Sequence, residues 1–151
     1  MNIFVLDLDP VKAAQYQCDK HVVKMILETA QLLCSVYPDG EAPYKRTHYN
    51  HPCAKWTRES MGNYNWLIKH GYALCDEYKF RYNKEHKSRS VIDWCNKDTG
   101  IVPHHIPTQF PECMPDQYKT GNIVYSYRNY YMIEKRDIAK WSKRSQPDWW
   151  K

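Results

Sequence analysis

The stretch that decides the fold is Asp19–Leu33, which reads Asp-Lys-His-Val-Val-Lys-Met-Ile-Leu-Glu-Thr-Ala-Gln-Leu-Leu. At about 100° per residue, a helix over this stretch carries one narrow polar stripe, and apolar residues fill the rest of its circumference. A helix that is apolar on most sides is normally buried, so we expect a central helix here without a solvent face. Its polar stripe must then face a partner or a cavity, because uncompensated buried charge is costly.

The polar stripe consists of His21, Lys24, Glu28 and Gln31. An imidazole, an ammonium group, a carboxylate and an amide in adjacent turns form a plausible reaction centre, and we favour this interpretation. The structural alternative is a buried ion pair between Lys24 and Glu28, whose i, i+4 spacing suits such a pair on any helix. The sequence leaves both interpretations open.

The composition is that of a folded protein. The 151 residues fit one domain with a proper core, and 42% of them are hydrophobic. No apolar run is long enough to span a bilayer and no signal peptide is evident, so we expect a cytoplasmic protein without a membrane partner. The six cysteines contain no Cys-x-x-Cys pair and are expected to be reduced and mostly buried.

The net charge of +5 lies in the C-terminal part of the chain. Residues 119–151 hold eight Lys or Arg against three Asp or Glu, whereas residues 1–118 hold fourteen of each. The same C-terminal segment carries seven aromatic residues, and a basic, aromatic surface is one footprint of nucleic-acid binding. We expect Tyr127, Tyr131 and Trp141 inside, and the candidate phosphate contacts outside: Arg128, Lys135, Lys140 and Arg144.

Periodicity and turn signals predict an all-α fold, a single domain over residues 1–151 with three principal helices. The first is Asp19–Leu33, preceded by a shorter helix that starts at Asp9-Pro10 and breaks near Cys18. The second runs from Cys53 to about Glu85, and the third from Thr120 to about Lys143. The connecting parts are an apolar strand or arm over Met1–Asp7, a loop over Tyr37–Pro52 and a long Pro-rich segment over Lys87–Gln117.

Several common sites are absent from the sequence. Its five glycines form no phosphate-binding loop, and no Gly-x-Ser-x-Gly nucleophile motif occurs. Cys18 beside Lys20 and His21 is best interpreted as a buried structural cysteine. Histidines at 48, 51, 104 and 105 and the thiol at 53 lack a standard zinc spacing, so we expect no metal and no cofactor.

The most coherent chemistry is that of Glu28 beside an amine. Cleavage of an N-glycosidic bond through an imine needs an amine that attacks the sugar C1′ and a carboxylate that stabilises the cationic transition state and moves protons. Two amines are candidates, the side chain of Lys24 and the α-amino group of Met1. An α-amino group titrates two to three units below a lysine in model peptides, about 7.7–8.0, which favours Met1.

The chain resembles the pyrimidine-dimer DNA glycosylase/AP lyase family, the endonuclease V family of T-even phages. In that family a short apolar arm leads to a helix with an Asp-x-His start and a glutamate seven residues after the histidine, as Asp19, His21 and Glu28 are spaced here. His51–Tyr82 resembles the family's central helix, and Glu134–Trp150 resembles its C-terminal helix and aromatic tail. The Cys18–Met25 run is also similar to that of small uncharacterised phage proteins.

The resemblance implies a compact endonuclease V-like fold that acts on DNA, in the host cytoplasm if the protein is phage-encoded. It implies an N-terminal amine as nucleophile and Glu28 as the catalytic glutamate. Two positions depart from the family. Met1 is followed by Asn2, which disfavours removal of the methionine, and the arginines that flank the family's glutamate are replaced by Leu27 and Gln31. Lys20 and Lys24 are the lysines that could contact phosphates instead.

These observations give one leading hypothesis and two alternatives. The leading hypothesis is a DNA glycosylase-like enzyme that cleaves or transfers at an N-glycosidic bond of DNA or a nucleotide. Glu28 is its catalyst, Met1 or Lys24 its nucleophile, and His21 and Gln31 orient the reactants. The first alternative is a non-catalytic nucleic-acid-binding module that uses the C-terminal segment. The second is a structural helical protein whose polar stripe is an internal ion pair.

Overall fold

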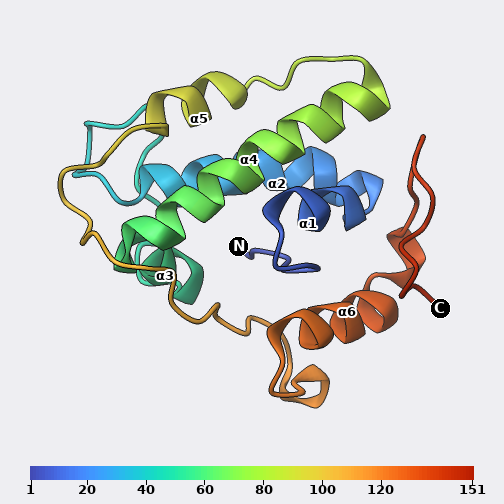
Figure 1. Cartoon of the computed structure of the whole chain (residues 1–151). Helices are drawn as coiled ribbons and strands as arrows, with labels where there is room; N and C mark the ends of the chain where they lie inside the picture. The colour runs from blue at the N-terminus through green and yellow to red at the C-terminus, as the bar shows by residue number, and fades with distance from the viewer.

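The computed structural model describes residues 1–151 and is helical throughout, without a strand (Figure 1). The predicted all-α fold is therefore confirmed. The elements are α1 (Pro10–Tyr16), α2 (Asp19–Cys34), α3 (Pro52–Glu59), α4 (Met61–Tyr82), α5 (Arg89–Cys95) and α6 (Ile123–Glu134), with the 3-10 turns η1 (Asp116–Tyr118) and η2 (Arg136–Ile138). One hydrophobic core of 33 buried residues draws on all six α-helices. No helix of the chain combines the length and the apolar character that crossing a bilayer requires.

The centre of the fold is the pair α2 and α4. The 22-residue helix α4 contacts α1, α2, α3 and α5. Helix α2 packs against α3, α4 and α5, but it is not buried on all sides as predicted. Val23 and Leu27 are 39% and 42% exposed. With Lys20 and Lys24 they recur at the i, i+3, i+4, i+7 spacing of one helix face, and this face is open to solvent.

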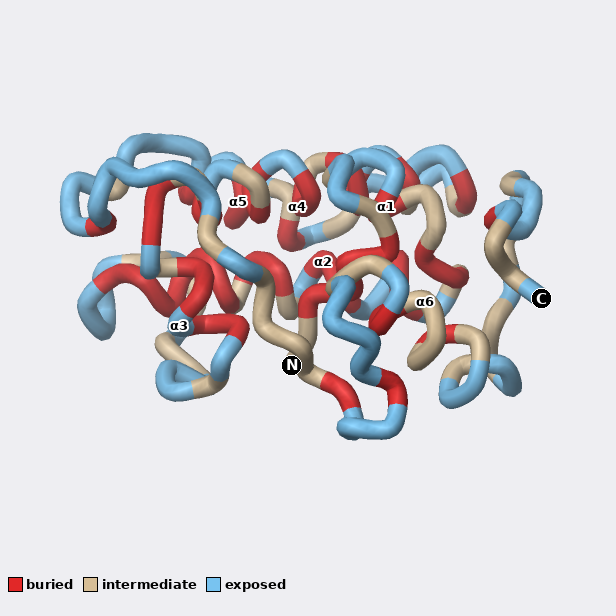
Figure 2. Tube along the Cα trace, turned by 60° about the horizontal axis from the view of Figure 1, so that its bottom comes forward, coloured by how far each residue is buried: buried red, intermediate tan, exposed pale blue.

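The N-terminal arm lies inside the molecule. Residues 3–6 are buried, and Figure 2 shows the arm running beneath α2 and beside α6. The Asn2 side chain holds the start of this arm, because its Nδ2 donates to the Cys113 carbonyl at 2.9 Å. Its Oδ1 accepts hydrogen bonds from the Tyr127 hydroxyl and the Ile3 amide, both at 2.8 Å. Of the two forms expected for Met1–Asp7, a strand or an extended arm tucked into the core, the structure has the arm.

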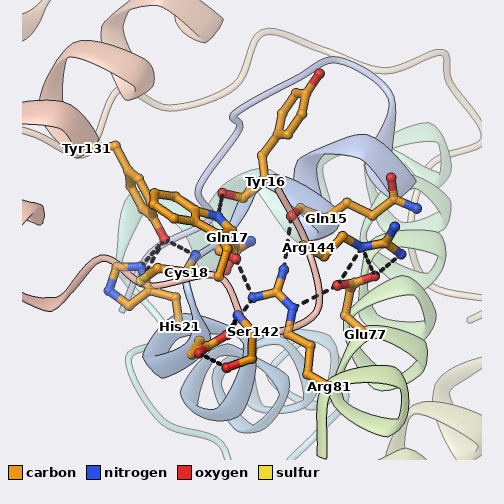
Figure 3. Close-up of polar contacts among 12 residues, drawn as sticks. Gln15, Tyr16, Gln17, Cys18, His21, Glu77, Arg81, Tyr131, Ser142 and Arg144 are labelled. Carbon is orange, nitrogen blue, oxygen red and sulfur yellow. Dashed lines mark hydrogen bonds and ion pairs between the residues drawn. The ribbon is translucent and has the colours of Figure 1, made fainter. Parts of the chain in front are cut away.

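The predicted break near Cys18 is present, and a buried arginine occupies it (Figure 3). Arg81 of α4 donates to the carbonyls of Gln15 and Gln17 at 2.9 and 2.8 Å. It also pairs with the carboxylates of Asp19 at 3.1 Å and Glu77 at 2.8 Å. The guanidinium thereby satisfies carbonyls that the end of α1 leaves without helical partners.

The predicted helix Cys53–Glu85 is wrong in one respect, because it is two helices. Ser60 is extended at φ −154° and ψ 153° and caps α4, with its hydroxyl accepting from the Asn63 amide. The amides of Met61 and Gly62 donate to the carbonyls of Pro103 and His105 instead of continuing α3. Side-chain periodicity carries no information about these partners, which lie some forty residues away in the chain.

The other helix boundaries also differ from the prediction. The Pro-rich segment contains α5, which hydrophobic periodicity does not predict because the helix has only seven residues. Helix α6 ends at Glu134, well before the predicted Lys143. Residues 140–142 are instead hydrogen-bonded along the start of α2, where the Lys140 carbonyl accepts from the Asp19 amide at 2.7 Å. The Ser142 amide and hydroxyl both donate to the Asp19 carboxylate.

The buried His70 makes folding sensitive to acid. Burial lowers the pKa of His70 to about 4, although the hydrogen bond from its Nδ1 to the Pro10 carbonyl acts in the opposite direction. In the unfolded chain His70 therefore takes up a proton as the pH falls below about 6.5. In the folded chain it does so only near pH 4. This contribution to stability is complete above pH 6.5 and is lost as the pH falls toward 4, by about 3 kcal/mol.

We expect His70→Asn to remove about one proton from the pH dependence of the free energy of unfolding between pH 6.5 and 4. Urea titrations of both proteins at several pH values measure this slope. An unchanged slope in a folded His70→Asn protein would contradict the assignment.

Candidate active site

A polar cavity of about 340 Å³ lies between the N-terminal arm and α2. It brings together five of the residues that the sequence singled out, namely Met1, His21, Lys24, Glu28 and Lys135. Gln31 does not line it, so the orienting role expected for its amide has no support from this geometry. The remaining lining residues are Asn2, Phe4, Met25, His51, Cys113 and Tyr130.

Glu28 lies between two amines in this cavity. Its Oε1 is 3.4 Å from the α-amino nitrogen of Met1, and its Oε2 is 3.7 Å from Nζ of Lys24. The Glu28 side chain is only 12% exposed, whereas that of Lys24 is 71% exposed. The Lys24–Glu28 pair is therefore present but half in solvent, unlike the buried pair of the structural alternative. The nearer partner of the carboxylate is the Met1 amine.

His21 is held as a neutral ring at the cavity wall. Its Nδ1 is 2.7 Å from the hydroxyl of Tyr131, and its ring stacks on Phe4 with centroids 4.4 Å apart. Burial, together with the positive charges of Lys135 and Lys24, lowers the pKa of His21 to about 4. The Tyr131 hydroxyl also donates to Sγ of Cys18 at 3.2 Å. Nε2 of His21 has no protein partner, so this ring nitrogen is left to hydrogen-bond a molecule in the cavity.

Asp19, the other half of the Asp-x-His pattern, does not line the cavity. It pairs with Arg81 and accepts from Ser142, so its role is to position the first turn of α2. The spacing between Asp19 and His21 thus joins a structural residue to a cavity residue.

His51 and Cys113 form a second wall of the cavity, and neither was assigned to this site from the sequence. Cys53 and Cys113 lie with their sulfur atoms 3.6 Å apart, and His51 brings a ring nitrogen into the same group, all within 4.8 Å. Hydrogen bonding from the Cys53 thiol lowers the pKa of Cys113 to about 7. Burial lowers the pKa of His51, and the nearby positive charge of the N-terminus adds to this effect. Sixty residues separate the two cysteines, so no sequence spacing links them.

Zinc prefers the donor types that His51, Cys53 and Cys113 offer. One ring nitrogen of the histidine, however, already accepts a hydrogen bond. Its Nδ1 accepts the Cys53 amide at 3.0 Å and caps α3, which places the ring proton on Nε2. Coordination through Nε2 would require moving that proton to Nδ1, where it would face the amide hydrogen. The arrangement therefore fits a hydrogen-bonded wall better than a metal centre.

The residues expected to contact nucleic acid fall into two groups. Arg128 donates to the Leu6 carbonyl at 3.0 Å and reaches Asp7 at 3.5 Å, while Arg144 binds both oxygens of the buried Glu77. These two guanidinium groups serve internal contacts. Lys20 and Lys140 are exposed, and Lys135 lines the cavity. Tyr127 and Tyr131 are buried as predicted, and Trp141 is half-buried with its Nε1 donating to the Tyr16 carbonyl.

Fold and cavity together define a small helical protein in which an amine and a carboxylate meet in one cavity. The profile of the family described as pyrimidine dimer DNA glycosylase matches residues 1–90, well over half of the chain. The protein belongs to this family. The matched range includes Met1, His21, Lys24 and Glu28, whereas Cys113, Tyr130 and Lys135 come from the remainder of the chain. Comparison with the curated proteins found no match, and comparison with the solved structures found none either.

The exposure of Lys24 predicts a small effect of Glu28→Gln on stability. A half-exposed ion pair contributes about 0–1 kcal/mol, and the glutamine oxygen can still accept from the Met1 amine. We expect the free energy of unfolding to fall by about 1 kcal/mol or less, as measured by urea denaturation. A loss of about 3–5 kcal/mol, typical of a broken buried ion pair, would favour a structural role for Glu28.

Proposed function

We propose that this protein is a DNA glycosylase that cleaves an N-glycosidic bond through an imine between the sugar and the α-amino group of Met1. The observation that carries the proposal is the 3.4 Å approach of the Met1 nitrogen to Glu28 inside a cavity. Membership of a DNA glycosylase family supports the substrate class. The low intrinsic pKa of α-amino groups supports the choice of nucleophile.

In the proposed reaction the amine lone pair forms a bond to C1′, and the bond between C1′ and the base breaks. Its electron pair leaves with the base, which takes up a proton. The amine then loses a proton and the C1′–O4′ bond opens, with a proton transferred to O4′, giving a protonated imine. Glu28 stabilises the cationic transition state and receives the amine proton. His21 offers its Nε2, which has no protein partner, as a hydrogen-bonding atom that positions the sugar or the base.

Met1 is a better nucleophile than Lys24 in this geometry. The Lys24 side chain is 71% exposed and its Nζ lies 3.7 Å from Glu28, so the cavity does not fix the position of this amine. The Met1 amine is held inside the cavity because Asn2 is fixed by Tyr127 and Cys113. Lys24 and Lys135 stand at the same cavity as positive charges suited to the phosphates of a bound nucleotide.

Borohydride trapping on DNA that contains an abasic site tests this mechanism. Reduction of the imine links protein and DNA, and mass spectrometry then locates the modified residue. We expect one adduct, on residue 1, which Lys24→Arg retains. We expect Glu28→Gln to lower the rate of its formation by about a hundredfold or more, the contribution typical of one proton-transfer group.

An adduct on Lys24 would show that the nucleophile is wrongly assigned. If the DNA binds without any adduct, the imine mechanism is wrong. Such a result would support the alternative of a non-catalytic nucleic-acid-binding module.

A further inference from the structure

Unpaired positive charge gathers in the segment between Glu41 and Glu59. Residues 42–58 contain no Asp or Glu, and their four Lys and Arg residues are Lys45, Arg46, Lys55 and Arg58. None of these four takes part in an ion pair. By contrast, the arginines at 81, 89, 128 and 144 all pair with carboxylates of the protein.

The two arginines of this segment are ordered by one aromatic ring. The guanidinium carbons of Arg46 and Arg58 lie over the ring of Tyr49, at 4.1 and 3.8 Å from its centroid. Arg58 also donates through Nη1 to the Tyr49 carbonyl at 2.6 Å. Arg46 donates through Nε and Nη2 to the carbonyls of Ser35 and Tyr37. Tyr49 is 38% exposed, so this arrangement lies at the surface.

Both guanidinium groups keep donors that no protein atom uses. Nη1 of Arg46 and the Nε and Nη2 of Arg58 make no hydrogen bond within the chain. With guanidinium groups over its ring, Tyr49 supports two cations and is not a platform for stacking a base. Planar guanidinium groups with free N–H edges match phosphate oxygens in a bidentate manner.

The basic segment adjoins the cavity. It runs through His51, which lines the cavity and caps α3. In Figures 1 and 2 the N-terminus lies between α3 on one side and α6 with the C-terminal segment on the other. Lys24 and Lys135 also line the cavity, so positively charged side chains are present both at the cavity and in the segment that passes it.

We propose that residues 45–58, centred on Arg46, Tyr49 and Arg58, bind the phosphate backbone of DNA whose target nucleotide occupies the cavity. This inference rests on the proposed function, since it takes the cavity to be the reaction site. Contacts of this kind position the strand without reading its sequence, so the surface contributes affinity and register and leaves base selection to the cavity.

The test compares two double variants that remove the same charge. Lys55→Gln with Arg58→Gln removes two cations of the basic segment. Lys84→Gln with Lys87→Gln removes two exposed, unpaired lysines beyond α4 and is the matched control. Fluorescence anisotropy with a labelled duplex carrying an abasic-site analogue gives the Kd over a series of salt concentrations, and thermal denaturation verifies folding.

We expect the Kd of the first variant to rise about tenfold or more over that of the control. The slope of log Kd against log salt should fall by about 0.9 for each phosphate that the variant no longer neutralises. Equal Kd values and slopes for the two variants would overturn this inference while leaving the proposed function intact. If the unmodified protein binds no DNA even at low salt, both proposals are wrong. Arg58→Lys separates charge from geometry, and we expect an intermediate Kd because it lacks the planar fork.

Discussion

The buried guanidinium of Arg81 is the contact on which the arrangement of the cavity depends. It joins α4 to the end of α1 and to the first residue of α2, through two carbonyls and the carboxylates of Asp19 and Glu77. Glu77 in turn binds Arg144, so two guanidinium groups and two carboxylates balance in charge (Figure 3). This cluster of four charged side chains is stable only when every member is present, because an unpaired buried charge costs several kcal/mol.

This arrangement determines where the reactive groups lie. Since Asp19 is held at the first residue of α2, the helical repeat fixes the directions of His21 and Glu28. The C-terminal segment closes over the same point, where Ser142 binds Asp19 and Trp141 binds the Tyr16 carbonyl. Residues from both ends of the chain therefore meet around the break between α1 and α2.

Local sequence signals predicted the parts of the fold that depend on local interactions. Asp9 and Pro10 do begin α1, and the apolar run after Asp19 does form α2. The break at Ser60 depends on carbonyls of a distant loop. At Gly62 that loop passes so close that an added Cβ would lie 2.5 Å from the Pro107 nitrogen. Contacts of this kind leave no periodic trace in the sequence. The solvent-exposed face of α2 was missed for another reason, because it includes the apolar residues Val23 and Leu27.

The same division applies to the site. The polar stripe and the family resemblance led to Glu28, His21, Lys24 and Met1, which line one cavity. His51 and Cys113 could not be found in this way, since only the folded chain brings them beside the N-terminus. Charge counting placed DNA contacts in the C-terminal segment, but Arg128 and Arg144 serve internal carboxylates. The structure shows which cations are already paired, and the basic residues of 42–58 are not among them.

The central claim is that the cavity beside Glu28 receives the target nucleotide of DNA. A crystal structure of the Glu28→Gln protein bound to a duplex with an abasic-site analogue tests it most directly. We expect the sugar in the cavity, with its C1′ facing the Met1 nitrogen and flanked by His21 and residue 28. A duplex that contacts only the C-terminal segment, with the cavity left to solvent, would contradict the claim.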